Sequence, residues 1–131
     1  MASSKITATS TRKESAITFL EMVSRGEVRP AYDRYIAPGF RHHNPYFKSD
    51  ALSLLHGMEE AHANSPRPKL EVQRAIEEGD LIAVHSRIRM DPDSPGVAVV
   101  HIVRFDGDRI VELWDVGQAV PERSQNEAGM F

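Results

Sequence analysis

The stretch Val97–Val116, VAVVHIVRFDGDRIVELWDV, decides the fold of this chain. Two runs rich in β-branched and aromatic residues flank an Asp-Gly pair, a pattern that predicts two antiparallel strands joined by a tight turn. His101 and Asp115 stand inside these apolar runs. Burial of an ionisable group costs free energy unless the group is paired, so this pair needs an explanation and is the first candidate for chemistry.

The first of the two strands is apolar on both faces. Because successive side chains of a strand point to opposite sides, residues 97–105 divide into two sets. One set is Val97, Val99, His101, Val103 and Phe105, and the other is Ala98, Val100, Ile102 and Arg104. Such a strand is covered on both sides, so we expect helices against one face and a cavity or a partner subunit against the other.

His101 and Asp115 face the same side in only one of two possible hairpin registers. A three-residue loop with Gly107 in the left-handed conformation pairs residues of like parity, whereas a two-residue Asp-Gly turn does not. The residues themselves leave both registers open. On a shared face, Asp115 would lie among apolar neighbours, where it could serve as a general acid or base near neutral pH. His101 could then orient a carbonyl, donate a hydrogen bond or relay the proton.

A structural role is the alternative for both residues, since structural networks also place ionisable groups among apolar ones. In the like-parity register, Trp114 takes the face opposite Asp115, where we expect core or a dimer interface. Arg104 and Glu112 share that opposite face and could form an ion pair across the hairpin.

Three helices are predicted before this hairpin. Thr11 and Glu14 have the spacing of a capping box, which opens a helix that Gly26 is placed to end. A second helix opens at Pro30 and stops at Pro38-Gly39, and a third, capped by Ser49 or Asp50, runs from Ala51 to about Ala63, before Ser65-Pro66-Arg67-Pro68.

Two further strands follow the third helix. Leu70, Val72, Arg74 and Ile76 alternate with their neighbours, Glu78-Gly79-Asp80 turns the chain, and Leu81–Met90 returns as a second strand. Residues 91–96 form a loop. Helices followed by an antiparallel meander indicate an α+β domain in which helices cover one face of a curved sheet. We expect one domain over residues 11–131, after a disordered segment at residues 1–10.

Composition narrows the possible partners. The chain has 131 residues, a formal net charge of -3 and no cysteine. This charge argues against a nucleic-acid or anionic-membrane surface, and the lack of cysteine removes disulfides and thiolate ligands. No apolar run approaches the ~20 residues that span a bilayer, and the polar opening segment lacks the apolar core of a secretory signal. We therefore expect a cytoplasmic protein that binds neither nucleic acid nor membrane.

A second cluster of candidate residues is His42-His43-Asn44-Pro45. Neighbouring side chains of an extended segment point to opposite sides, so at most one of the two histidines faces any cavity. Asn44 precedes a proline and could present its amide to a ligand. The alternative is that these side chains tie a loop to the helices.

Other aromatic and histidine side chains carry weaker signals. Tyr46 is expected in the core or in a cavity wall, and His85 is a weaker pocket candidate. His56 and His62 are six positions apart on the third helix and so lie on different faces. The HExxH pattern of a zinc site is absent, so no metal is expected. GxSxG, P-loop and GxGxxG motifs are also absent.

Four segments in order resemble the SnoaL-like branch of the nuclear transport factor 2-like superfamily: HHNPYF, AVVHIVRFDGDRI, VELWDVGQ and the terminal NEAGMF. The resemblance spans about Glu14 to Phe131. It implies a cone-shaped α+β fold, a strongly curved antiparallel sheet wrapped around helices, with a deep pocket and usually a homodimer formed through the sheet. It also favours the like-parity register.

The resemblance also implies roles for individual residues. Polyketide-cyclase members use a pocket aspartate on the last long strand as general acid/base of an aldol condensation, with a histidine on the preceding strand. The matching residues here are Asp115 and His101, and the HHNP segment would place His43 and Asn44 at the pocket mouth. Val99 departs from the polar residue that the cyclases often have two positions before the histidine.

These observations predict a small-molecule pocket protein, an acid/base enzyme without metal or organic cofactor. Asp115 and His101 would be catalytic, and His43, Asn44, His85 and Tyr46 would contact the ligand. Aldol cyclisation, isomerisation and dehydration of a small apolar carbonyl or hydroxyl compound fit this arrangement. The alternative is a ligand-binding or dimerisation module of the same fold without chemistry.

Overall fold

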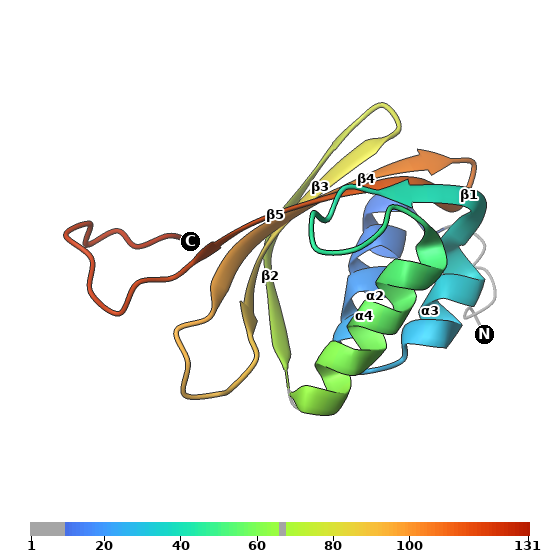
Figure 1. Ribbon diagram of the computed structural model, residues 1–131. Coiled ribbons are helices and arrows are strands. Elements are labelled where there is room, and N and C mark those ends of the chain that lie inside the picture. Colours follow the sequence, from blue (N-terminus) through green and yellow to red (C-terminus); the bar gives the residue numbers. More distant parts are fainter. Residues whose placement is uncertain (1–9, 66–67) are drawn as a thin grey trace, which may run out of the picture.

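The computed structural model describes residues 10–65 and 68–131. In this part of the chain, three helices pack against one face of a five-stranded sheet (Figure 1). The helices are α2 (Arg12–Ser24), α3 (Val28–Tyr35) and α4 (Ala51–Asn64), and the strands are β1 (Ile36–His42), β2 (Lys69–Glu78), β3 (Leu81–Arg89), β4 (Val97–Asp106) and β5 (Arg109–Ala119). Apart from Ser10, the segment predicted to be disordered lies outside the described residues, as do Pro66 and Arg67.

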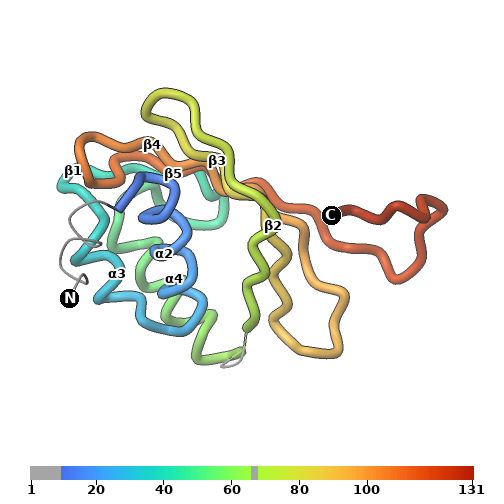
Figure 2. The backbone as a smooth tube through the Cα atoms, turned by 180° about the vertical axis from the view of Figure 1, so that it is seen from behind, coloured from blue at the N-terminus to red at the C-terminus, as the bar shows by residue number. Residues whose placement is uncertain are grey.

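The sheet has the strand order β1-β5-β4-β3-β2. Strands β2 to β5 form the predicted antiparallel meander, and the α+β fold class is confirmed. Seen from behind, the helices lie together beneath one half of the curved sheet, while the segment after β5 extends away from them (Figure 2). No helix in the described ranges is both long and apolar enough to cross a membrane.

Side-chain caps start two of the helices where expected. The Thr11 hydroxyl accepts the Glu14 N–H at 3.1 Å, and the Glu14 carboxylate accepts the Thr11 N–H at 2.8 Å, which completes the capping box of α2. Asp50 caps α4 by accepting the Ser53 N–H at 2.9 Å. The starts of these helices are therefore encoded locally.

The predicted end of the second helix is wrong, and a strand follows it that was not expected. Helix α3 ends at Tyr35, and Pro38 and Gly39 lie inside β1, which pairs in parallel with β5. A proline fits here because β1 is an edge strand with a register irregularity between Ile36 and Arg41, so no ladder hydrogen bond requires its missing N–H.

The β4–β5 hairpin has the like-parity register, reached by an unexpected route. Asp106 pairs with Arg109, so the turn has two residues, and Gly107 adopts a φ of 61°. The register shifts between Arg104 and Phe105 because Val111 is an extra residue, a β-bulge. This bulge, and not a three-residue loop, brings His101 opposite Asp115.

The core lies between the helices and the inner face of the sheet. Phe19 of α2 contacts Tyr32 and Tyr35 of α3, with ring centroids 5.7 and 6.2 Å apart. The sheet contributes inward-facing residues that are almost completely buried, namely Ile82, Val84, Val103, Phe105, Ile110 and Leu113. His101 and Asp115 therefore face the helical layer.

Candidate functional site

His101 and Asp115 form a pair on the inner face of the sheet. They lie directly opposite each other on β4 and β5, with 3.8 Å between His101 Nε2 and Asp115 Oδ1. This separation is too long for a hydrogen bond but close enough for a strong electrostatic interaction. The His101 side chain is 11% exposed and that of Asp115 25%, so the carboxylate is the more accessible of the two.

Burial keeps the His101 ring neutral. Loss of hydration lowers the pKa of His101, and the neighbouring Asp115 carboxylate opposes this shift. A neutral imidazole carries one donor and one acceptor nitrogen. His101 Nδ1 is buried and has no hydrogen-bond partner, which is unusual for a polar atom in a protein interior.

Asn44 holds the carboxylate of Asp115 in place. Its Nδ2 donates to Asp115 Oδ2 at 3.1 Å, while its Oδ1 accepts the Tyr46 N–H at 3.0 Å. One carboxylate oxygen is thus bound to the loop after β1, and the other faces His101. The structure brings together three predicted site residues: Asp115, His101 and Asn44.

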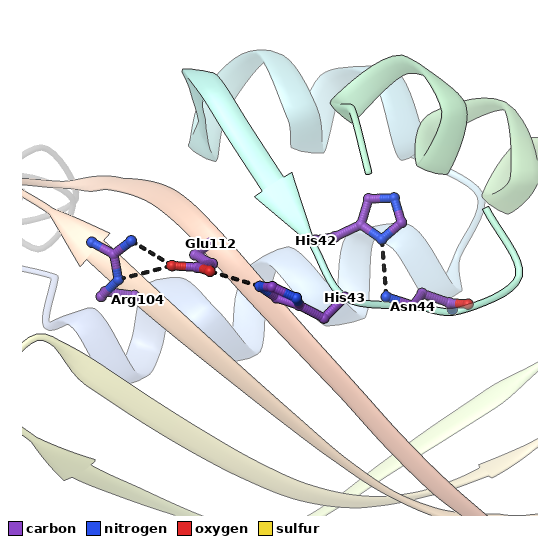
Figure 3. A network of polar contacts seen from close by, with 5 residues as sticks. All are labelled: His42, His43, Asn44, Arg104 and Glu112. Carbon is purple, nitrogen blue, oxygen red and sulfur yellow. Dashed lines mark hydrogen bonds and ion pairs between the residues drawn. The ribbon is translucent and has the colours of Figure 1, made fainter. Parts of the chain in front are cut away.

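His42 stabilises the loop that carries Asn44 by contacts with two of its backbone groups. The ring is buried, and its Nε2 lies 2.6 Å from the carbonyl oxygen of Lys48. Its Nδ1 accepts the Asn44 N–H at 3.1 Å (Figure 3). His42 therefore has the structural role that was the alternative for this cluster, since its ring ties down the loop.

His43 lies on the outer face of the sheet. Its Nε2 is 2.6 Å from Glu112 Oε2 (Figure 3). The ring also stacks on that of Trp114, with centroids 5.0 Å apart. Glu112 also accepts from Arg104, with the guanidinium Nε at 3.2 Å, as predicted. These contacts hold the pKa of Glu112 below its usual range, Arg104 having the larger effect. Adjacent residues of an extended segment point to opposite sides. Because Asn44 contacts Asp115 on the inner side, His43 lies outside the inner cavities.

Two adjoining cavities lie between the sheet and the helices. The larger has a volume of about 130 Å³ and the smaller about 50 Å³, and Asp115 lines the smaller one. Burial also raises the pKa of the Tyr32 hydroxyl in its wall. The two cavities share Leu20, Val23, Met58 and His101, so His101 stands between them.

Tyr46 and His85 do not line these cavities. Tyr46 is 86% exposed, so it belongs neither to the core nor to a cavity wall. His85 points to the outer face, where it contacts Arg74 and stacks on the ring of Phe131. It lines a separate outer hollow of about 510 Å³ together with Val100, Val116 and Met130. Neither side chain therefore lines the cavity beside Asp115.

The structure adds His62 to the predicted set. His62 lines the larger cavity, and its Nδ1 is buried without a partner. Its position was recognisable from helical spacing, because His62 follows the inward-facing Leu55 and Met58 at intervals of three and four residues. His56 lies on another face, with its side chain 63% exposed.

A metal site has no support in the described ranges, which contain no cluster of three or more His, Asp or Glu side chains able to hold an ion. The cavities instead offer an apolar wall, one carboxylate and two imidazole rings. This donor set suits proton transfer and hydrogen bonding to a small organic molecule.

Solved structures with the same fold include proteins of several bacteria. An NTF2-like protein of unknown function from Cytophaga hutchinsonii has a TM-score of 0.67 at 16% identity, covering 82% of this chain and 90% of its own. A candidate polyketide cyclase from Acidithiobacillus ferrooxidans has a TM-score of 0.67 at 19% identity, covering 84% and 90%. Wild-type IdmH from Streptomyces antibioticus, another candidate polyketide cyclase, has a TM-score of 0.68 at 18% identity, covering 82% and 92%.

A comparison with curated proteins finds no match. The sequence model of the SnoaL-like domain, in contrast, matches residues 16–113, most of the chain. The match includes His101 and Asn44 and stops two residues before Asp115. This match and the NTF2-like fold together establish that the chain belongs to the SnoaL-like family.

Proposed function

We propose that this protein is an acid/base enzyme that needs no cofactor and acts on a small apolar carbonyl or hydroxyl compound. The observation that carries the proposal is the Asp115 carboxylate facing His101 in the wall of an apolar cavity, 3.8 Å from its Nε2. A positioned base in such a site contributes typically ~10²–10⁴-fold to a proton transfer. Aldol cyclisation, isomerisation and dehydration all begin with that step.

Asp115 is the proposed base. Its free oxygen takes a proton from the carbon next to a carbonyl, and the electrons of the broken C–H bond form an enolate. Neutral His101 donates a hydrogen bond to the enolate oxygen. Protonated Asp115 then returns the proton to another carbon, to the alkoxide that forms when the enolate attacks a second carbonyl, or to a hydroxyl group that leaves as water. Asn44 keeps the second carboxylate oxygen occupied, so Asp115 presents one oxygen to the substrate.

The comparisons support this reaction class only through the fold. Two similar structures are described as candidate polyketide cyclases, and ring closure of that kind requires a carbanion next to a carbonyl. At 18% and 19% identity this likeness concerns the fold, so the chemistry rests on Asp115 and His101.

Proton exchange tests the proposal without knowledge of the natural substrate. In D₂O, the protein should accelerate deuterium incorporation at the carbon next to the carbonyl of 1-tetralone, followed by NMR. Asp115→Asn should lower this rate by about 10²–10⁴-fold, whereas Asp108→Asn, at the remote turn, should not. If the wild-type protein binds 1-tetralone but exchanges it no faster than Asp115→Asn, the protein is a binding module.

We also propose a homodimer formed through the outer face of the sheet. Val116 on this face is 63% exposed, and the partly exposed Val100, Ile102 and Trp114 share the face with it. Contiguous exposed apolar side chains commonly mark an interface. Sedimentation should give a dimer that Val116→Lys dissociates, while Leu52→Lys, at a 62% exposed residue of α4, leaves it intact. A monomeric wild-type protein would contradict this proposal.

A further inference from the structure

His62, which lines the larger cavity, has room for its ring because residue 26 is a glycine. A Cβ atom on Gly26 would come within 2.5 Å of His62 Nε2, and the φ of 88° at Gly26 also favours glycine. The tip of the imidazole therefore packs directly against the backbone that follows α2. This close approach fixes the ring, whose other nitrogen, Nδ1, is buried.

Two unpartnered nitrogens belong to residues that line this one cavity. His62 Nδ1 and His101 Nδ1 are both buried and lack hydrogen-bond partners within the described part of the chain. Buried polar atoms in proteins are nearly always hydrogen-bonded, so two exceptions on residues of one cavity wall require an explanation. A bound molecule with a polar group near each histidine supplies it.

The rest of the wall limits the chemistry of that molecule. Leu20, Val23, Met58, Leu70 and Ile88 surround the cavity, and none of its lining residues in the described ranges is Lys or Arg. An anionic group would lose its hydration here without a cationic side chain in return. A neutral body is therefore favoured.

We propose that the ligand is a neutral, two-ended molecule whose far end carries a hydroxyl group that hydrogen-bonds to His62. The carbonyl end lies at His101 and reaches Asp115 in the smaller, adjoining cavity, and in that placement the inference rests on the proposed function. A hydroxyl both donates and accepts, so it satisfies His62 Nδ1 in either tautomer of the ring.

The cavity also sets the size of the ligand. A water molecule needs about 10–15 Å³ of such space, so a cavity of about 130 Å³ accommodates on the order of ten non-hydrogen atoms. This corresponds to one or two fused rings. A hydroxylated bicyclic ketone has the required size and carries its two polar groups at opposite ends.

Calorimetry with two matched probes tests the inference. Both are bicyclic ketones, and 6-hydroxy-1-tetralone differs from 1-tetralone only by a hydroxyl group across the ring system from the carbonyl. The wild-type protein should bind the hydroxylated probe about three- to tenfold more tightly, as expected for one net hydrogen bond. His62→Leu should remove this preference, and His62→Gln, which retains hydrogen-bonding groups, should keep part of it.

His56→Leu is the matched control, because His56 lies on the same helix with its side chain 63% exposed. It should leave the preference unchanged. The ring nitrogens of His62 should also shift in NMR spectra when 6-hydroxy-1-tetralone is added, and much less with 1-tetralone.

Each outcome separates this inference from the proposed function. Equal affinities for the two probes, or a preference that survives in His62→Leu, would overturn the role of His62 while leaving Asp115 chemistry intact. A preference that depends on His62 without any Asp115-dependent proton exchange would support the binding mode and overturn the enzymatic proposal. Failure of both probes to bind would overturn both proposals.

Discussion

Asn44 Nδ2 donates to Asp115 Oδ2 at 3.1 Å, which joins the loop after β1 to the carboxylate on β5. The neighbouring His43 contacts the same strand on its other face, through the Glu112 carboxylate. Two consecutive side chains thus contact β5 on its two faces. Asn44 contacts the candidate base itself, whereas His43 contacts Glu112 on the same strand.

Asn44→Ala should weaken both the fold and the candidate site. Loss of one hydrogen bond to a partly buried carboxylate lowers the free energy of unfolding by about 1 kcal/mol. Proton exchange should slow several-fold, less than in Asp115→Asn, because the base remains but is less well positioned. Asn126→Ala is the control, since Asn126 makes a similar turn contact, to the Ala128 N–H at 3.0 Å, far from Asp115. Equal effects of the two variants on exchange would contradict this role.

Because of Glu112, the free energy of unfolding should depend on pH in the acidic range. Its contacts with Arg104 and His43 lower its pKa from the ordinary value of 4.5, so folding favours the ionised form. The stabilisation is fully present above pH 4.5 and is lost as the pH falls through the lowered, folded-state pKa. Urea midpoints of wild type and Glu112→Gln should therefore differ most above pH 5 and converge as the pH falls below the lowered pKa of Glu112. The exposed strand variant Glu77→Gln should show no such convergence, and parallel curves for wild type and Glu112→Gln would count against the prediction.

His101 should make the free energy of unfolding depend on pH in a higher range than Glu112 does. Burial lowers its pKa below the ordinary value of 6.5, so the unfolded chain binds a proton that the folded chain excludes. Stability is therefore retained above pH 6.5 and falls as the pH drops below it, through the depressed pKa of the folded state. His101→Gln should flatten urea midpoints between pH 7 and pH 5 relative to wild type, whereas His56→Gln should not. An unchanged slope in His101→Gln would show that the ring is not held neutral.

Gly26→Ala should be more destabilising than Gly79→Ala. Both glycines have positive φ, 88° and 60°, so each alanine introduces backbone strain of order 1 kcal/mol. Only at Gly26 would the new Cβ meet another side chain, at 2.5 Å from His62 Nε2, whereas Gly79 has open space around it. Adding His62→Ala to Gly26→Ala should recover part of the excess loss, measured in a double-mutant cycle by urea unfolding. Additive effects would mean that the two residues do not interact.

Local chemistry explains the parts of the fold that were predictable. Caps at Thr11 and Asp50, the change from helical to alternating periodicity, and the Gly107 turn depend on residues close together in the chain. The pairing of Arg104 with Glu112 followed once a register was assumed. For the same reason, His101 and Asp115 stood out as ionisable residues among apolar ones.

The sequence by itself thus determined which segments become helices and antiparallel strands, and that two of the strands carry a histidine and an aspartate among apolar residues. Tertiary structure alone decided the Val111 bulge, the parallel pairing of β1, and the division of His43 and Asn44 between the two faces of the sheet. These features depend on contacts between segments distant in the chain, because a one-residue shift in pairing moves every side chain to the other face. Asn44 is therefore beside the candidate base and His43 is not, although the two are neighbours in sequence.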